Sequence, residues 1–519
     1  MIELPPVKTA TIEVTGDQVE AADVVAVARR GALARLSEAA RAAMAESATV
    51  VERLARSDEA VYGISTGFGS LATTRIPYER REELQRAVLR SHAAGMGPPV
   101  EREVVRAMMF LRVRSLAMGR SGVRPVVADT MLALLAAGLD PVVPEHGSLG
   151  ASGDLAPLAH CGLVLIGEGE VWNPSGGRVA AAQALAGASI EPLTLSAKEG
   201  LALINGTDGM LGMLVLALDD LAQLLRVADV TAAMSTEALL GTDRAFAAEL
   251  VEMRPQPGQA QSAGNLRRLL AASPIVASHR HDDPRVQDAY SLRCAPQVNG
   301  AARDAWSYAE GVAAAELRSA IDNPMVLPDG RIESCGNFHG APVALACDFL
   351  ALGAAEVGAI AERRTDRLLD ASRSYGLPPF LTEDAGVNSG LMLAHYTQAS
   401  MVAENRRLCV PASTDSLPTS AMQEDHVSMG WAAARKLRAV LENLGRILAV
   451  ELTCAARALD LRAPLGPGNG TAAARDAVRA AVPGVGPDRW LAPELAEVEA
   501  LVTGGIVLES VEAAIGALE

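Results

Sequence analysis

The 519-residue sequence predicts an all-α protein built from long, packed helices. Half of its residues are hydrophobic but only 3% are aromatic, so the core is mainly aliphatic, and Ala and Leu favour helix. Apolar residues also recur at helical spacing between residues 431 and 462, a pattern that persists until Pro464. They are Leu437, Leu441, Leu444, Leu448 and Leu452. Strand signals are thin, and we expect them only at residues 9–14 and as short hairpins near residues 172–179.

Further helical runs cover residues 104–118, 201–228, 301–321 and 341–369, separated by short polar or Gly/Pro-rich breaks. We expect two domains. Residues 1–200 form a mainly helical N-terminal domain, and residues 201–519 form a helical domain with a central bundle of long helices and C-terminal helices. Helices of this length expose more apolar surface than one subunit covers, which favours oligomerisation.

The bulk composition indicates a cytoplasmic protein. The net charge of −16 leaves no Lys/Arg surplus for a nucleic-acid or anionic-membrane partner. The most apolar stretch, residues 343–361, contains Asp348 and Glu356 and is better explained as a buried helix than as a membrane span. Residues 1–6 show no secretory signal. The six cysteines lack a Cys-x-x-Cys pair and are typical of reduced thiols, not of a disulfide framework or zinc site; they are Cys161, Cys294, Cys335, Cys347, Cys409 and Cys454.

The tripeptide Ala151-Ser152-Gly153 can become an electrophile without an outside cofactor. If the amide nitrogen of Gly153 attacks the carbonyl carbon of Ala151, a five-membered ring closes. Loss of two waters, one of them carrying away the Ser152 hydroxyl, then leaves an exocyclic methylene conjugated to the ring. Taken alone, an Ala-Ser-Gly sequence is also a common turn.

The longer run from Gly147 to His160 resembles the signature of the ammonia-lyases that carry a methylidene-imidazolone (MIO) group, a family with histidine, phenylalanine and tyrosine lyases. The resemblance extends over nearly the whole chain. It implies that Ala151, Ser152 and Gly153 form MIO autocatalytically, that no external cofactor is used, and that the fold is of the aspartase/fumarase-like ammonia-lyase type. It also implies a homotetramer in which each active site is shared between subunits.

Two further motifs match catalytic segments of that family. The Gly-rich segment around Tyr62 is expected to be a loop, and the resemblance implies that Tyr62 is the base that removes the substrate β-proton. Asn205, in Leu203-Ile204-Asn205-Gly206-Thr207, would ordinarily be a helix cap. The resemblance instead implies that its side chain lies near MIO and the substrate amine.

The segment from Val286 to Cys294 supplies expected substrate contacts. Arg293 is the natural carboxylate anchor because a guanidinium holds a carboxylate through two parallel hydrogen bonds. The resemblance implies that Tyr290 and Gln287 support MIO and the bound substrate, and that Phe338 packs near the MIO ring.

Two positions indicate which amino acid is the substrate. His92 follows Ser91, a pair found in histidine lyases of this family where aromatic lyases carry His-Leu or Phe-Leu. Glu424 is typical of histidine lyases at a position where aromatic lyases carry Gln. The resemblance therefore implies that His92 and Glu424 bind an imidazole, and that L-histidine is converted to trans-urocanate and ammonia. Whether Glu424 acts as an acid/base or only as an anchor stays open.

Three alternatives remain beside this interpretation. A tyrosine or phenylalanine lyase, or an MIO aminomutase, would share the electrophile and the base and differ only in the pocket. A catalytically silent helical homologue would have lost the electrophile or the base, and this chain retains both.

The Met422–His426 cluster alone would also fit a helix start or a metal site, but no His-x-x-x-His or matching Cys set accompanies it, so we expect no metal.

Overall fold

The computed structural model describes residues 11–57, 61–67, 69–281, 283 and 285–519. The start at residues 1–6 and the first two residues of the expected strand at 9–14 lie outside them. Within them the chain forms two compact units. The first comprises residues 1–216, 310–347 and 411–435, and the second comprises residues 217–309, 348–410 and 436–519. The first change of unit falls near the expected domain boundary at residue 200, and later segments alternate between the units.

The described part is mostly helical. The helices that begin in the first unit are α1 (Ala21–Arg29), α2 (Glu38–Ala55), α3 (Arg81–His92), α4 (Arg102–Ala117), α5 (Pro125–Ala137), α6 (Leu155–Leu165), α7 (Ala181–Gly187), α8 (Glu199–Ile204), α9 (Asp208–Ala238), α15 (Ala341–Leu369) and α17 (Gly430–Asp460). Those that begin in the second are α10 (Ala248–Glu252), α11 (Pro257–Leu269), α12 (Pro274–Ala277), α13 (Tyr290–Arg293), α14 (Ala295–Glu316), α16 (Met392–Leu408), α18 (Asn469–Ala481), α19 (Leu491–Thr503) and α20 (Ile506–Ile515).

Short strands, all in the first unit, form four small sheets in the described part of the chain. The strands are β1 (Ile12–Val14), β2 (Ala34–Leu36), β3 (Met96–Pro99), β4 (Asp140–Pro141), β5 (Pro144–His146), β6 (Glu170–Trp172), β7 (Arg178–Ala180), β8 (Met325–Val326) and β9 (Ile332–Glu333). β1 pairs in parallel with β2. β6 and β7 form the antiparallel hairpin expected near residues 172–179, with Val171 opposite Val179.

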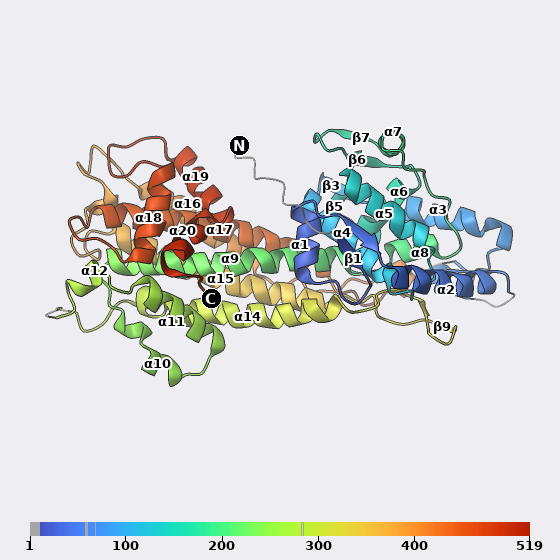
Figure 1. The fold of residues 1–519 in the computed structure, drawn as a ribbon, viewed down its shortest axis with the longest axis horizontal. Helices are drawn as coiled ribbons and strands as arrows, with labels where there is room; N and C mark the ends of the chain where they lie inside the picture. Colours follow the sequence, from blue (N-terminus) through green and yellow to red (C-terminus); the bar gives the residue numbers. More distant parts are fainter. Residues whose placement is uncertain (1–10, 58–60, 68, 282, 284) are drawn as a thin grey trace. The chain divides into compact units, whose positions relative to one another are not determined.

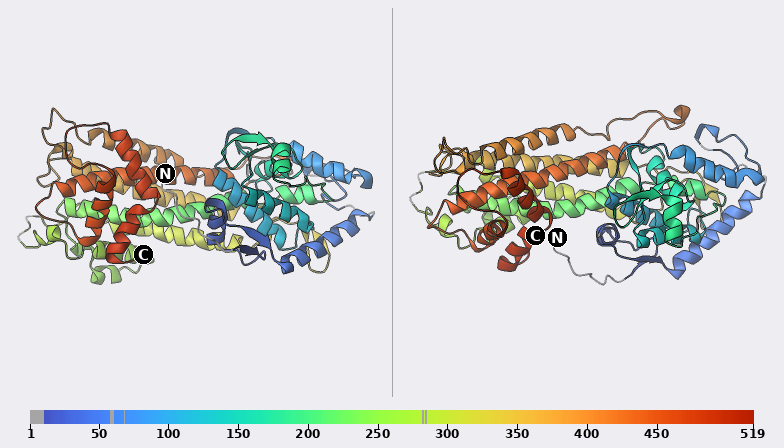
Figure 2. Two further views of the ribbon diagram at one scale, coloured as in Figure 1. Left: turned by 45° about the horizontal axis from the view of Figure 1, so that its top comes forward. Right: turned by 90° about the horizontal axis from the view of Figure 1, so that it is seen from above.

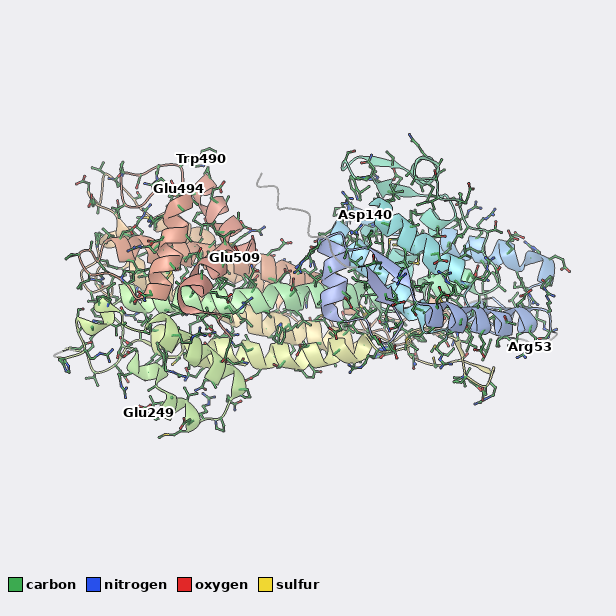
Figure 3. The ribbon with its side chains drawn as sticks, viewed as in Figure 1. Arg53, Asp140, Glu249, Trp490, Glu494 and Glu509 are labelled. Carbon is green, nitrogen blue, oxygen red and sulfur yellow. The ribbon has the colours of Figure 1, made fainter. Side chains whose placement is uncertain are left out.

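The first unit packs around α4, most of whose residues are buried. This helix contacts α1, α2, α5 and α6 (Figure 1). Local signals set the ends of these helices. Ser37 caps α2 by accepting the amide of Ala40 at 3.0 Å. Helix α5 begins at Pro125 and is followed by Gly138, whose φ of 65° favours glycine. Asp140 is buried beneath α4 and pairs with Arg102 at 2.6 Å and Arg106 at 2.9 Å (Figure 3).

In the second unit, long helices run side by side (Figures 1 and 2). Small residues allow this close approach: a Cβ on Gly353 of α15 would lie 3.2 Å from Ala302 of α14, and one on Gly358 would lie 3.1 Å from Ile447 of α17. Helices α18, α19 and α20 pack against one another. Exposed acidic residues such as Glu249, which pairs with Arg244 at 3.0 Å, contribute to the negative net charge (Figure 3).

The helix predicted over residues 431–462 is confirmed as α17, and the five leucines of its predicted face are all buried. The runs at 104–118, 301–321 and 341–369 correspond to α4, α14 and α15, although α14 ends at Glu316. The run at 201–228 is not one helix. It breaks at residues 205–207 between α8 and α9, because the carbonyl of Asn205 accepts Arg112 Nη1 at 2.8 Å and the amide of Gly209 donates to Asp154 at 2.9 Å, so the two do not form a helical hydrogen bond.

Helix α15 is long and apolar enough to cross a membrane by length and composition, with a mean hydropathy of 1.8 over its most apolar 18 residues. However, 61% of that window is buried within the protein. Its Asp348 accepts a hydrogen bond from Lys436 at 2.8 Å. These observations agree with the predicted buried helix.

Candidate active site

The Ala151–Ser152–Gly153 tripeptide forms a tight turn just before α6. Ser152 has φ 51° and Gly153 has φ 81°, both in the left-handed region, and the amide of Gly153 donates to the carbonyl of Gly150 at 3.4 Å. A Cβ on Gly153 would lie 2.1 Å from the carbonyl oxygen of Gly206. Only glycine therefore fits at the position whose nitrogen would close the ring.

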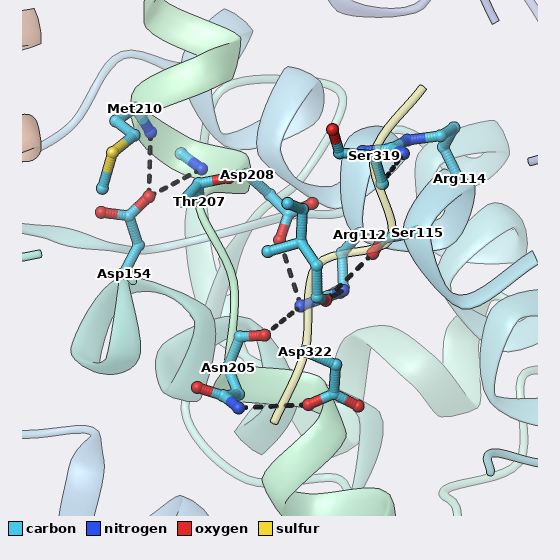
Figure 4. Close-up of polar contacts among 12 residues, drawn as sticks. Arg112, Arg114, Ser115, Asp154, Asn205, Thr207, Asp208, Met210, Ser319 and Asp322 are labelled. Carbon is cyan, nitrogen blue, oxygen red and sulfur yellow. Dashed lines mark hydrogen bonds and ion pairs between the residues drawn. The ribbon is translucent and has the colours of Figure 1, made fainter. Parts of the chain in front are cut away.

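Asp154 attaches this turn to the start of α9. Its backbone amide donates to the carbonyl of Gly206 at 2.7 Å. Its carboxylate accepts the amides of Gly209 and Met210, each at 2.9 Å, and the hydroxyl of Ser148 at 3.0 Å (Figure 4). Burial raises the pKa of Asp154 to about 7, against the lowering effect of these hydrogen bonds. The turn is thus held to a helix N-terminus by a fully buried side chain.

A cavity of about 450 Å³ in the first unit opens beside the turn. It brings together five residues predicted for the site, which are Tyr62, His92, Ser152, Asn205 and Glu424. Ala151 and Gly153 flank Ser152 in the chain. Apolar side chains form much of the remaining wall, among them Leu71, Ile76, Leu84, Val88, Leu155, Leu201 and Ile204. Such a space, mostly apolar with a few convergent polar groups, suits a small ligand.

Tyr62 lies half-buried in the cavity wall, and its hydroxyl oxygen accepts the amide of Gly69 at 3.0 Å. Burial raises the pKa of Tyr62, and the nearby charge of Glu424 raises it further, while the bond from Gly69 lowers it. A phenol that acts as a base near neutral pH needs a lowered pKa, and burial of Tyr62 works in the opposite direction.

His92 ends α3, and its ring orientation is defined by the backbone. Nδ1 lies 2.9 Å from the carbonyl oxygen of Val88, which can only accept, so Nδ1 carries the hydrogen. Burial lowers the pKa of His92, with the Val88 hydrogen bond and the charge of Glu424 opposing that shift. The neutral ring therefore keeps Nε2 as an acceptor.

Glu424 approaches the cavity from a short turn that begins at Thr419. The Thr419 hydroxyl donates to Glu424 Oε2 at 2.8 Å, and the backbones of the two residues also pair. Within the same turn, Ser420 accepts the amide of Ser70 at 3.4 Å, which links this segment to the one that carries Tyr62. The effect of Glu424 on the pKa values of both Tyr62 and His92 shows that the three groups interact.

Asn205 ends α8, and buried charges surround it. Its carbonyl accepts Arg112 Nη1 at 2.8 Å, and its side-chain nitrogen donates to Asp322 Oδ1 at 3.1 Å and to the carbonyl of Asn323 at 2.8 Å (Figure 4). Asp322 in turn accepts Lys198 Nζ at 2.6 Å. Arg112, Asp322 and Lys198 are all buried.

A second buried pair lies behind Asn205. Arg112 also pairs with Asp208 at 3.2 Å and donates to the carbonyl of Ile321 at 2.8 Å. The neighbouring Arg114 donates to the carbonyl of Ser319 (Figure 4), and burial lowers the pKa of Arg114 to about 10. The Asn205–Gly206 backbone is therefore backed by fixed positive charge.

The remaining predicted residues lie outside this cavity's lining. Phe338 is half-buried in the first unit, between β9 and α15. Gln287, Tyr290 and Arg293 belong to the second unit, where Gln287 is exposed and Tyr290 is 71% exposed. The Arg293 guanidinium lies 4.5 Å from the centre of the Tyr290 ring, and among the described residues its buried Nε atom has no hydrogen-bond partner.

Sequence reasoning assigned no role to Arg112, Lys198, Asp322 or Asp154. Arg112 and Asp322 are identified only by their contacts with Asn205. Lys198 is identified by its contact with Asp322. Asp154 was visible in the sequence as the residue after the tripeptide. Lys198 also carried a signal, since it is one of three lysines among 46 basic residues.

The chain resembles known proteins over nearly its full length. The aromatic amino acid lyase family matches residues 19–480. A protein of Streptomyces coelicolor named histidine ammonia-lyase is 60% identical over 509 residues, which cover 98% of this chain and 99% of that one. The structure of tyrosine aminomutase from Streptomyces globisporus superposes with a TM-score of 0.93 at 37% identity, covering 98% of this chain and 100% of that one. Histidine ammonia-lyase from Trypanosoma cruzi gives a TM-score of 0.89 at 38% identity, covering 98% and 96%.

Proposed function

Because the chain belongs to the aromatic amino acid lyase family, and so is a carbon–nitrogen lyase, we propose that it is a histidine ammonia-lyase. The reaction is the elimination of ammonia from L-histidine to give trans-urocanate, the first step of histidine degradation. The observation that carries the proposal is the cavity in which a tyrosine, the Ala-Ser-Gly turn, Asn205, His92 and Glu424 meet. The 60% identity to a relative of that name supports the choice of substrate.

The turn at Ala151, Ser152 and Gly153 fits the formation of MIO from the chain itself. Ring closure requires the nitrogen of Gly153 to reach the carbonyl carbon of Ala151, and two consecutive left-handed residues fold the tripeptide tightly. The contact of Gly153 with Gly206 supports that folded arrangement. Once formed, the group supplies an electrophilic carbon for the substrate amine, which makes the amine a better leaving group.

Tyr62 takes the β-proton of the substrate at its Oη atom. The phenol must first lose its own proton, and burial disfavours this by raising its pKa. The Gly69 amide, which points at the same oxygen, stabilises the phenolate form. Proton removal therefore becomes more effective as the pH rises through the alkaline range.

His92 and Glu424 bind the substrate imidazole. The hydrogen on Nδ1 of His92 leaves Nε2 to accept an N–H of the imidazole. The carboxylate of Glu424 is an alternative acceptor in the same cavity, since a neutral imidazole has a single N–H to donate to either group. Glu424 acts either as an anchor of the ring or as an acid/base during elimination.

The remaining groups keep the roles that the family resemblance implies. Arg293 holds the substrate carboxylate, Gln287 and Tyr290 support MIO and the substrate, and Phe338 of the first unit shields the MIO ring. The exposure of Tyr290 and the unpaired buried Nε of Arg293 support a role for this segment in binding.

The assembly is a homotetramer of all-α subunits with shared active sites, located in the cytoplasm, without a nucleic-acid or membrane partner. An apolar surface on the second unit supports oligomerisation, because large hydrophobic side chains there are about half exposed. They are Tyr308, Phe349, Leu352, Leu393 and Tyr396.

The test is to incubate the purified protein separately with L-histidine, L-tyrosine and L-phenylalanine while following ammonia and the absorbance of each unsaturated acid. Urocanate from histidine alone is the expected result. Formation of cinnamate or coumarate would agree with the family's mechanism but would contradict L-histidine as the substrate. Formation of a β-amino acid would indicate an aminomutase, the activity named for the Streptomyces globisporus structure.

Intact mass spectrometry tests the electrophile independently of activity. We expect the mature chain to weigh less than its sequence by two waters. A chain of unmodified mass would overturn the MIO proposal.

A further inference from the structure

We propose that Lys198 and Asp322 are positioning residues, a buried ion pair that orients the side-chain amide of Asn205 so that its oxygen faces the substrate amine. This inference rests on the proposed function, since it concerns the amine that the reaction removes. Neither residue lines the cavity described above, so both act through Asn205.

The orientation of the Asn205 amide follows from the chemistry of its partners. Its nitrogen has two hydrogens, and they meet Asp322 Oδ1 at 3.1 Å and the carbonyl oxygen of Asn323 at 2.8 Å. A carboxylate and a carbonyl can only accept, so the nitrogen has to face them. The Asn205 oxygen then lies on the side away from Asp322 (Figure 4), as an acceptor for an amine N–H.

Asp322 is positioned by donors at both of its oxygens. Oδ1 accepts the Asn205 side chain and the backbone amide of Asn323, the latter at 2.7 Å. Oδ2 accepts Lys198 Nζ at 2.6 Å. The side chain is 1% exposed, so its charge depends on that cation for compensation.

Lys198 is specialised for this contact. Its side chain is fully buried, and its ammonium donates to Asp322 and to the carbonyl of Ser121 at 3.0 Å. The chain uses lysine only at positions 8, 198 and 436, and Arg everywhere else it places a permanent positive charge. A compact ammonium fits two acceptors in a small buried space, where a planar guanidinium would need more room.

Asp322→Asn is the most informative change because it keeps the shape of the side chain. Lys198 will draw the oxygen of the new amide toward itself, since a hydrogen bond from a charged donor is the stronger one. The NH₂ group then faces Asn205 Nδ2, donor against donor. Asn205 is expected to turn over and present its nitrogen to the cavity.

The measurement compares two ligands of the mature enzyme, L-histidine and 3-(imidazol-4-yl)propanoate, which lacks the amine. In D322N we expect kcat/KM for L-histidine to fall about 10- to 100-fold, the scale of one hydrogen bond to a charged group. The dissociation constant of the amine-free ligand, measured by calorimetry, should change less than about threefold. Intact mass should still show the loss of two waters.

The double variant K198M/D322N distinguishes a change in the orientation of the Asn205 amide from a general disruption of the site. Without the ammonium, the new amide can turn its oxygen back to Asn205, so kcat/KM should recover by about tenfold relative to D322N. Lys436→Met is the matched control, because Lys436 also pairs with an aspartate, Asp348, at 2.8 Å in the second unit. We expect it to leave both ligand measurements unchanged.

Several outcomes would overturn the inference. Full activity of D322N would do so, as would an equal fold-loss in kcat/KM for L-histidine and in affinity for the amine-free ligand, or a double variant less active than D322N. If the wild-type protein releases no ammonia from L-histidine and does not bind the amine-free ligand, the proposed function itself fails. The two failures are therefore distinguishable.

Discussion

Two sides of the cavity differ in how they are held. The tripeptide wall, which we define as Ser152 and Asn205, is backed by buried charged side chains. These are Arg112, Asp154, Lys198, Asp208 and Asp322. The loop wall, defined as Tyr62, His92 and Glu424, is half-buried, and its side chains bond to neutral partners at most seven residues away in the chain, which are Gly69, Val88 and Thr419.

The difference indicates a division of labour. Groups that meet the electrophile and the amine are fixed by networks whose disruption would leave a buried charge unpaired, which is costly. The groups that we propose for the β-proton and the imidazole, Tyr62 and His92, both have pKa values that the charge of Glu424 raises. Changes in the tripeptide wall should therefore prevent the electrophile from forming or acting, and changes in the loop wall should leave the electrophile intact while they lower turnover, weaken recognition or shift the pH dependence.

The largest effect is expected from Ser152→Ala in the tripeptide wall. Without the hydroxyl that leaves as water, the exocyclic methylene cannot form, so turnover should be nearly abolished. Intact mass should show no loss of two waters, while the thermal unfolding midpoint stays close to that of the unmodified chain. Ser510→Ala, whose hydroxyl bonds only within α20 at 2.9 Å, is the control. Retained turnover in S152A would contradict the proposed electrophile.

Tyr62→Phe should have the next largest effect, because it removes the base and leaves the electrophile intact. We expect kcat to fall about 10²- to 10⁴-fold, the range associated with a general base. The mass should still show the loss of two waters. Tyr78→Phe, at an exposed tyrosine, should change neither quantity. Near-normal turnover by Y62F would show that a group other than Tyr62 is the base.

His92→Leu should weaken recognition without stopping the chemistry. Loss of the Nε2 acceptor should reduce kcat/KM for L-histidine about 10- to 100-fold. The same change should improve the ratio of activity on L-phenylalanine to activity on L-histidine. An unchanged ratio would show that His92 does not determine which substrate is preferred.

The smallest change is a shift in pH dependence. The charge of Glu424 raises the pKa of Tyr62, so Glu424→Gln should lower that pKa. The acid limb of the kcat/KM profile should then move to lower pH, because the phenolate forms sooner. Glu249→Gln, at an exposed residue, should leave the profile in place. A shift in the opposite direction would show that Glu424 is not the charged neighbour of the base.

Much of the fold was predictable because helical periodicity is local. The buried leucines of α17 follow from their spacing alone, and the motifs identify Tyr62, Ser152 and Asn205 as members of one site although they are far apart in the chain. The break between α8 and α9 was missed because it depends on Arg112 of α4 and on Asp154, which bond to the carbonyl of Asn205 and the amide of Gly209 in place of a helical hydrogen bond. The domain boundary at residue 200 and the roles of Gln287, Tyr290, Arg293 and Phe338 stay predictions.

The sequence by itself determined the family and the chemistry that we propose, because the Ala-Ser-Gly tripeptide, Tyr62, His92 and Glu424 are residue types at recognisable positions. Only the tertiary structure decided how these groups are tuned. Burial sets the direction of the Tyr62 pKa shift, and it is a property of the folded surroundings. Likewise, the orientation of the Asn205 amide depends on Lys198 and Asp322, whose contact joins residues 124 positions apart in the chain.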